Sequence, residues 1–207
     1  MSGDCYQPAE ETYRLMPGVV TALAEAGVLA TVYTRSPLVL RDAALLAECG
    51  VRVAVSIAFV DERIRRAVEP GAVGGAGAVG AGGVAGGGGG VDCRVLMGPV
   101  LPLLSDGSDQ LAATVRRIGQ AGVRSVEPVV LRLPAGTRSW FGAWLEQAHP
   151  GLVARYEELY GRDGLPSPAY EERILGQIAQ LCRVYGMRCG PGEPEPRDPW
   201  FGQLALV

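Results

Sequence analysis

Short apolar runs that alternate with helical patterns restrict the fold of this chain more than any other feature of its sequence. The runs 28–33 and 51–57 are dominated by apolar and β-branched residues, as is typical of strands buried on both faces. Two later runs, 93–100 and 125–133, have the same character. Helical patterns separate and follow these runs, and such an order predicts parallel βαβ units. We therefore expect an α/β protein with a parallel sheet of about four strands and helices at its C-terminal end.

The helices are predicted from apolar spacing and from glycines that end each pattern. The first should span about residues 8–26, with Leu15, Val19 and Leu23 on one apolar stripe and Gly27 as its stop. The other patterns predict helices near 38–49, 61–68, 108–121, 139–148, 152–160 and 168–185. Four strands are too few to close a barrel of eight or to form the usual six-stranded doubly wound sheet. The sequence therefore predicts part of a larger α/β architecture.

A glycine-rich tract interrupts this alternation, because twelve of the twenty residues from Gly71 to Gly90 are glycine. Each glycine costs a helix about 1 kcal/mol relative to alanine. Twelve of them would oppose a crossover helix by about 10 kcal/mol, which is comparable to the whole stability of a domain. The stretch 75–80 matches G-x-G-x-x-G, but no strand precedes it and no helix opens from it, so a nucleotide site is not favoured. We interpret the tract as a low-complexity insert or linker.

The tract suggests a division of the chain into four parts. Residues 1–70 would hold the first βα units, and residues 71–91 the insert. Residues 92–187 would hold the remaining βα units and the C-terminal helices. The last part, 188–207, begins with a stretch rich in Pro, Gly and acidic residues, which predicts a disordered tail.

Charge and cysteine usage exclude several partners. The net charge of −3 argues against a nucleic-acid binder, whose surface would be basic. The uncharged run 70–91 is long enough to span a bilayer but too rich in glycine for a membrane helix. The five cysteines are scattered and odd in number, and the polar N-terminus lacks the apolar segment of a signal peptide. We therefore expect reduced thiols and a cytoplasmic location.

Neither a hydrolytic triad nor a zinc site is predicted. The single histidine, His149, precedes a proline at a helix end, where a solvated C-terminal cap is its expected role. The two closest cysteines, Cys182 and Cys189, are seven residues apart, which does not fit the spacing of zinc ligands.

Polar residues instead gather where the predicted strands end. In parallel α/β folds ligands bind at the carboxyl ends of the strands, so these residues are candidates for a binding site. The alternative is that they are ordinary loop-edge residues satisfied by the backbone. They are Thr34, Arg35 and Ser36 after the first strand, Ser56 in the second and Arg132 after the fourth, while Gly98 and Pro99 close the third run.

A series of short motifs runs through residues 4–186. They read D-C-Y-Q-P-A-E at 4–10, T-R-S at 34–36, L-R-D at 40–42, V-S-I at 55–57, E-P-G at 69–71 and G-P-V-L-P at 98–102, the last followed by Asp106. A longer stretch, 138–160, contains W-L at 144–145 and R-Y-E at 155–157. In order and spacing they resemble segments of radical S-adenosylmethionine (SAM) proteins, in particular the actinobacterial proteins that resemble spore photoproduct lyase. Arginine stands at position 35, where that family usually has lysine, which keeps the charge and changes its geometry.

The resemblance implies a partial TIM-type (β/α) barrel that binds SAM and a 4Fe–4S cluster. In such enzymes the cluster reduces SAM and releases a 5′-deoxyadenosyl radical. By the same resemblance, SAM would contact Thr34, Arg35 and Ser56, with Asp4 and Gln7 close by. A cation and hydroxyls suit the carboxylate and amine of a methionyl group. The substrate side of the barrel mouth would include Tyr6, Pro99 and Arg132.

Two features of the family are missing from this sequence. The cluster motif C-x₃-C-x₂-C is absent, and no spacing among the five cysteines imitates it. The two strands expected before Asp4 are missing as well. We therefore expect the C-terminal portion of a radical SAM protein that cannot hold the cluster alone, with SAM and a separate chain carrying the cluster motif as partners. The alternatives are a non-catalytic module that completes a barrel with another chain, and a metal-free hydrolase or transferase of similar topology.

Overall fold

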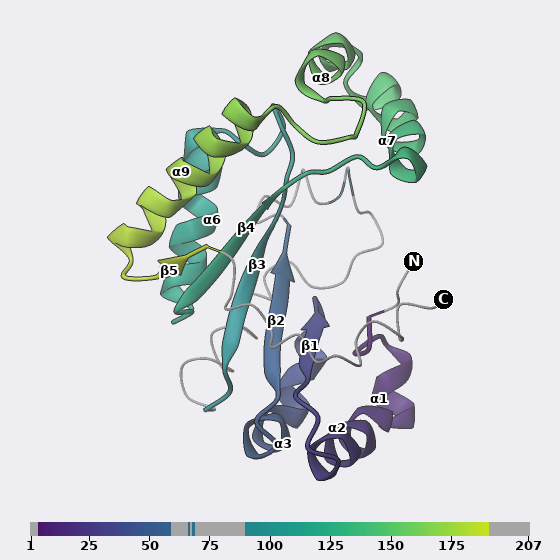
Figure 1. Ribbon diagram of the computed structural model, residues 1–207, viewed down its shortest axis with the longest axis vertical. Helices are drawn as coiled ribbons and strands as arrows, with labels where there is room; N and C mark the ends of the chain where they lie inside the picture. The colour runs from purple at the N-terminus through teal and green to yellow at the C-terminus, as the bar shows by residue number, and fades with distance from the viewer. Residues whose placement is uncertain (1–3, 59–65, 67, 69–89, 191–207) are drawn as a thin grey trace.

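The computed structural model describes residues 4–58, 66, 68 and 90–190 of the 207-residue chain. Within these ranges it contains a five-stranded parallel sheet in the order β1-β2-β3-β4-β5 (Figure 1). The helix expected near 61–68 lies outside the described residues except for positions 66 and 68, and so do most of the glycine tract and the tail beyond residue 190. The strands are β1 (Thr31–Thr34), β2 (Arg52–Ile57), β3 (Cys93–Val100), β4 (Ser125–Val130) and β5 (Arg188–Cys189).

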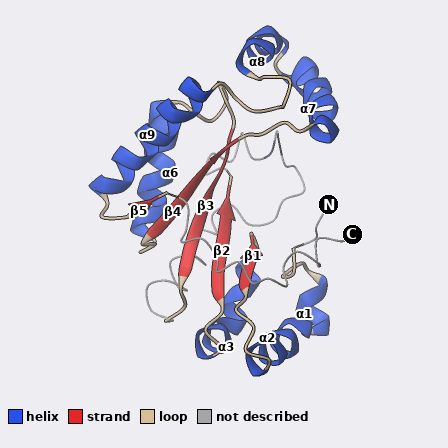
Figure 2. Ribbon diagram, viewed as in Figure 1, coloured by secondary structure: helices blue, strands red, loops and turns tan. Residues whose placement is uncertain are grey.

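Helices connect and flank these strands (Figure 2). The α-helices are α1 (Ala9–Tyr13), α2 (Leu15–Glu25), α3 (Ala43–Glu48), α6 (Ser108–Gln120), α7 (Ala135–Ala148), α8 (Val153–Leu159) and α9 (Pro168–Val184). Two 3₁₀ helices are η1 (Pro37–Asp42) and η2 (Pro150–Leu152). The prediction of an α/β fold with a parallel sheet is therefore confirmed. The described sheet has a fifth strand that was not predicted, since two residues after a glycine turn make no apolar run.

The main core lies between one face of the sheet and four helices. Alternate strand residues such as Val53, Val55 and Val95 are buried on this face, together with side chains of α2, α3, α6 and α9. All four strand pairings are parallel and follow chain order. Right-handed crossovers in one direction place successive helices on the same face, which explains the one helix layer that the described helices form against the sheet.

The first predicted helix is wrong as one element, because Arg14 breaks it into α1 and α2 with a left-handed backbone conformation (φ +47°). The Glu10 carboxylate accepts hydrogen bonds from the backbone N–H groups of Leu15 and Met16, at 2.9 and 3.1 Å. These are donors of the first turn of α2, which have no partner within the helix. A long-range contact therefore sets this boundary, since Arg41 Nη2 in turn lies 2.7 Å from Glu10 Oε1.

The apolar stripe predicted for that helix is not the side that faces the core. Val20 is the side chain that α2 buries in the core, whereas Leu15 and Val19 are 66% and 47% exposed. The helix is apolar on more than one side, so its sequence does not determine which side faces the sheet. Its stop at Gly27 is confirmed, with a φ of +68° that favours glycine.

Other boundaries shift by a few residues. The pattern at 38–49 forms η1 followed by α3, strand β4 ends at Val130, and α7 begins at Ala135 rather than near Ser139. His149 is the residue at the C-terminal end of α7, as predicted, and its ring lies 5.6 Å from the ring of Trp144. A second, smaller core lies beneath α7 and α8 at the carboxyl end of the sheet. It contains Leu101, Leu131, Leu133, Phe141, Leu145, Tyr156 and Tyr160.

Candidate functional site

The face of the sheet opposite the main helix layer carries polar and charged residues. Successive side chains of a strand point to opposite faces, so Tyr33, Ser56, Arg94 and Glu127 lie on this second face. The strand register places Tyr33, Ala54 and Arg94 in one row across β1, β2 and β3. Ser56 and Glu127 share the next row, with Leu96 between them. We call Tyr33, Ser56, Arg94 and Glu127 the polar sheet face.

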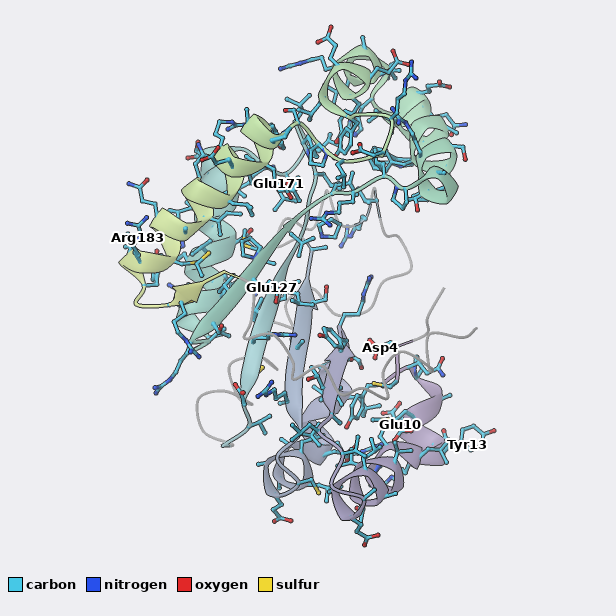
Figure 3. All side chains as sticks on the ribbon, viewed as in Figure 1. Asp4, Glu10, Tyr13, Glu127, Glu171 and Arg183 are labelled. Atoms are coloured by element: carbon cyan, nitrogen blue, oxygen red, sulfur yellow. The ribbon has the colours of Figure 1, made fainter. Side chains whose placement is uncertain are left out.

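Arg94 links three strands of this face. Its Nη2 donates a hydrogen bond to the Tyr33 hydroxyl at 2.8 Å, and its guanidinium carbon lies 5.7 Å from the centre of that ring. The side chain can reach Tyr33 across β2 because the intervening residue, Ala54, is small. On the other side, Arg94 Nε lies 3.8 Å from Oε2 of Glu127. Glu127 is labelled in Figure 3. The polar sheet face therefore combines a cation, a carboxylate and an aromatic ring.

One donor of this group is not satisfied. Arg94 Nε is buried and has no hydrogen-bond partner among the described residues. The 3.8 Å to Glu127 exceeds the length of a hydrogen bond. A buried donor without an acceptor costs about 1–3 kcal/mol, so such a group in a native protein calls for a ligand, water or ion.

A second polar cluster lies at the carboxyl end of β1. Asp4 Oδ1 accepts hydrogen bonds from Thr34 Oγ1 at 2.7 Å and from the Tyr6 N–H at 2.8 Å. Asp4 Oδ2 accepts from the Arg35 N–H at 2.9 Å. The Thr34 oxygen also accepts from the Ser36 N–H at 3.0 Å. The structure thus brings together Asp4, Thr34 and Arg35, but it uses the Asp4 carboxylate and the Thr34 hydroxyl to hold the chain at residues 4–6 against β1.

Tyr6 belongs to a buried network rather than to the sheet edge. Its ring is 1% exposed, and its hydroxyl donates to Asp42 Oδ2 at 3.1 Å. Burial, with the Asp42 carboxylate beside it, raises the pKa of Tyr6 far above the usual range. Arg41 Nε and Nη2 bond both Asp42 oxygens, at 2.9 and 2.7 Å. The network ties the N-terminal helices to η1 and stabilises their position beside β1.

The remaining predicted site residues lie apart from one another. Ser56 is half-buried on the polar sheet face, whereas Gln7 is exposed. Pro99 is half-buried in β3. It follows Gly98, where a Cβ would collide with the carbonyl oxygen of Val129. Arg132 is 61% exposed and pairs with Glu171 of α9 at 3.7 Å, so it extends toward the helix layer.

Sequence reasoning missed Tyr33, Arg94 and Glu127. Each stands at an alternate position of a run that is otherwise apolar enough to predict a strand buried on both faces. A period-two pattern of polar residues in β2 and β3, with Arg52 and Ser56 in one and Arg94 in the other, was the available signal. It predicts a polar face only once the strands are aligned.

The described residues do not fit an iron–sulfur cluster. The described residues include all five cysteines. In this part of the chain no three His, Cys, Asp or Glu side chains are close enough to share a metal ion. Burial also raises the pKa of Cys93 to about 11 and that of Cys182 to about 12. Without a metal ion these two thiols are therefore protonated near neutral pH.

No family model matches the sequence. The chain is similar to the uncharacterized proteins Mb2609c of Mycobacterium bovis and Rv2578c of Mycobacterium tuberculosis, with 39% identity over 208 aligned residues. The match covers 99% of this chain but 60% of each relative, so the chain spans about three fifths of the length of the curated relatives it matches. In the part of the chain that the structure describes, no helix is long and apolar enough to cross a membrane.

Proposed function

We propose that this chain is the carboxyl-terminal portion of a radical SAM barrel, and that its polar sheet face binds SAM. The observation that carries this proposal is the consecutive, all-parallel strand order with one helix layer on the opposite face. The motifs quoted above supply the family. As a half-barrel, the chain would work in the cytoplasm, beside a region or second polypeptide that holds the cluster.

The strand order favours a barrel-like arrangement over a doubly wound sheet. In a doubly wound sheet the order reverses at one point, so that helices cover both faces. Strands β1 to β5 show no reversal, and continued addition in the same direction curves such a sheet toward a barrel. The face without the main helix layer then becomes the inner one. Its polar side chains suit a binding surface better than a packed interior.

The chemistry of this face suits the parts of SAM. Arg94 would bind the methionyl carboxylate through the accessible part of its guanidinium, because a guanidinium and a carboxylate form charge-assisted hydrogen bonds. Glu127 would attract the ammonium group, and the Tyr33 ring offers a surface for the sulfonium cation or the adenine. Ser56 would add a hydroxyl contact, as the family resemblance implies. The same resemblance adds Arg35, whose backbone Asp4 holds at the carboxyl edge.

We do not propose that this chain alone binds the iron–sulfur cluster. Apart from Cys182 and Cys189, whose thiols lie within hydrogen-bonding range of each other, the cysteines are dispersed over the described structure. Burial raises the pKa of four of the five thiols. The thiolates must then come from another region or another chain. The part of the curated relatives that lies outside the match, about two fifths of their length, is long enough to provide them.

Calorimetric titration of the 207-residue chain with SAM tests the proposal. We expect saturable binding that weakens by at least about tenfold in Arg94→Gln, which corresponds to about 1.4 kcal/mol. Arg183→Gln is the matched control, because Arg183 is an exposed residue of α9 that bonds the Ala179 carbonyl of its own helix and does not belong to the polar sheet face. An affinity that both variants reduce equally, or the absence of binding at millimolar SAM, would refute the site.

A second candidate is a non-catalytic module that completes a barrel with another chain. The dispersed thiols favour it, since among the described residues nothing in the chain can hold a cluster. The same titration separates the two candidates. A module without SAM affinity that still associates with a cluster-bearing polypeptide would support this second function.

A further inference from the structure

Two cysteines face each other between α9 and β5. Helix α9 buries Ile174, Ile178 and Cys182, which follow at intervals of four residues and so lie on the side of the helix that faces the sheet. Strand β5 pairs in parallel with β4, and Cys189 lies opposite Val126. Residues paired in register point to the same face of a sheet, and Val126 is buried in the main core. The side chain of Cys189 is therefore directed toward the helix layer that contains α9.

A tight turn at the end of α9 brings the two thiols together. The Met187 N–H donates to the Cys182 carbonyl at 3.0 Å, and the Gly186 N–H donates to the Arg183 carbonyl at 3.1 Å. With Gly186 at a φ of +65°, these bonds form a Schellman motif, which ends the helix and reverses the chain. Strand β5 consequently lies beside the last turns of α9 (Figure 1). The Cys182 and Cys189 thiols are within hydrogen-bonding range of each other.

The two thiols differ in exposure and in surroundings. Cys182 is 0% exposed, whereas Cys189 is half-buried. Burial raises the pKa of Cys182 to about 12, and a hydrogen bond to the Cys189 sulfur raises it further. Burial raises the pKa of Cys189 too, but the hydrogen bond from Cys182 and the charge of Arg183 oppose that rise. Cys189 is therefore the thiol that solvent reaches and that ionises first, with Cys182 as its buried neighbour.

We propose that Cys182 and Cys189 form an oxidisable dithiol, which hydroperoxides convert to an intramolecular disulfide. The Cys189 thiolate attacks one peroxide oxygen, the O–O bond breaks, and the other oxygen leaves as alkoxide or hydroxide. Cys189 is then a sulfenic acid. The Cys182 sulfur attacks the Cys189 sulfur, the S–O bond breaks, and the oxygen leaves with the thiol proton as water. Two thiols are thereby oxidised by two electrons, and one hydroperoxide is reduced to an alcohol, or to water when it is hydrogen peroxide.

The site suits a reversible modification. A disulfide brings its sulfurs to about 2 Å, so thiols that already contact each other need only a small approach. The five cysteines are free thiols in the structure, which is the resting state of such a pair. Disulfides that form in a reducing compartment are typically transient and redox-sensing. A low-molecular-weight thiol then returns the pair to the reduced state by thiol–disulfide exchange.

The disulfide fixes the shortest described strand to the helix layer. Strand β5 contains only Arg188 and Cys189, and the Arg188 N–H donates to the Arg124 carbonyl at 2.9 Å. A segment with so few bonds opens more readily than the core strands. A covalent bond from Cys189 to Cys182 ties it to a fully buried position of α9. This inference does not depend on SAM binding at the polar sheet face.

Peptide mapping of the 207-residue chain after treatment with hydrogen peroxide tests the proposal. Trypsin cleaves after arginine and places the two cysteines on separate peptides, 174–183 and 189–197. After alkylation of the remaining thiols, we expect these peptides to be joined, with a mass lower by two hydrogen atoms than their sum. Reduction before digestion should separate them. Joined peptides that involve other cysteines to the same extent, or none at all, would overturn the proposal.

Three variants assign the roles of the two thiols. Cys189→Ser should lower the oxidation of Cys182 by at least about tenfold, because a buried thiol alone is inert. Cys182→Ala should leave Cys189 as a sulfenic acid that dimedone traps. Cys49→Ser is the matched control, since Cys49 is also half-buried but lies at the end of α3, and the yield of joined peptides should not change. Equal loss of that yield in Cys49→Ser and Cys189→Ser would refute the pair.

Amide hydrogen exchange tests whether the bond fixes β5. In the oxidised chain we expect exchange at Arg188 to slow by at least about tenfold relative to the reduced chain. Peroxide-treated Cys189→Ser should show no such slowing. Unchanged exchange in a chain with the disulfide would overturn the proposed effect on β5. Joined peptides from two different copies of the chain, seen as a dimer without reductant, would overturn the intramolecular bond.

Discussion

Replacement of Thr34 by valine tests whether its hydroxyl serves the protein or a ligand. The change removes a buried hydroxyl but keeps the shape and the β-branch of the side chain. In the structure this hydroxyl donates to the Asp4 carboxylate at 2.7 Å and accepts from the Ser36 N–H at 3.0 Å. Thr34 is 3% exposed, so solvent cannot replace either bond. The family resemblance instead implies a contact between Thr34 and SAM.

The expected cost of Thr34→Val follows from these two bonds. A hydrogen bond to a charged group contributes about 1.5–3 kcal/mol, and we take the lower part of this range because Asp4 is half-buried. We therefore expect the free energy of unfolding to fall by about 2 kcal/mol. For a chain of this length that is about 4–8 °C in Tm.

Urea denaturation followed by circular dichroism measures the change, with Thr31→Val as the control. Thr31 lies on the same strand and undergoes the same chemical change, but its side chain points to the other face. Equal stability of the two variants would refute the reasoning, because it would mean that the Asp4 bond contributes nothing. Loss of SAM affinity at unchanged stability would assign the hydroxyl to the ligand.

Three further outcomes are expected. Gly164→Ala should lower the free energy of unfolding by more than the about 1–3 kcal/mol that a positive φ costs, because the added Cβ would collide with the Leu133 carbonyl. Gly122→Ala is the control, since Gly122 also has a positive φ but lies in open space. Equal urea midpoints of the two variants would exclude the collision. Burial raises the pKa of Cys182 to about 12, whereas a thiol of the unfolded chain ionises near about 9. The free energy of unfolding should therefore fall as the pH rises from about 9 toward 12, and Cys182→Ala should make this decline less steep. Parallel pH profiles of the two proteins would contradict the prediction. Anaerobic incubation with iron and sulfide should leave the chain without the visible absorbance of a cluster, and a brown, stoichiometric product would show that the dispersed thiols can assemble one.

Much of the fold could be predicted because local sequence patterns indicate most of the strands. The β-branched runs that became β2, β3 and β4 are buried, and their order with the intervening helices fixes a parallel arrangement. Gly27 and Gly50 end their helices at φ values of +68° and +65°, as a helix stop requires. Strand β5 was not predicted, because Arg188 and Cys189 form a strand only through their pairing with β4.

The candidate site could be predicted only in part. The polar residues after β1 were found, and the structure does place Asp4, Thr34 and Arg35 in contact. The pair of Arg94 and Tyr33 was not found, since these residues are 61 positions apart and meet only across β2. Arg132 was expected with the others, but its ion pair with Glu171 holds it toward α9.

By itself the amino-acid sequence determined the type of most elements, their order and many of their ends. These properties depend on backbone preferences and on neighbours within a few positions along the chain. Only the tertiary structure decided which side of α2 faces the sheet and which strand residues share the polar face. Those properties depend on strand register and on packing between segments distant in sequence, and an apolar pattern that suits several faces leaves them undetermined.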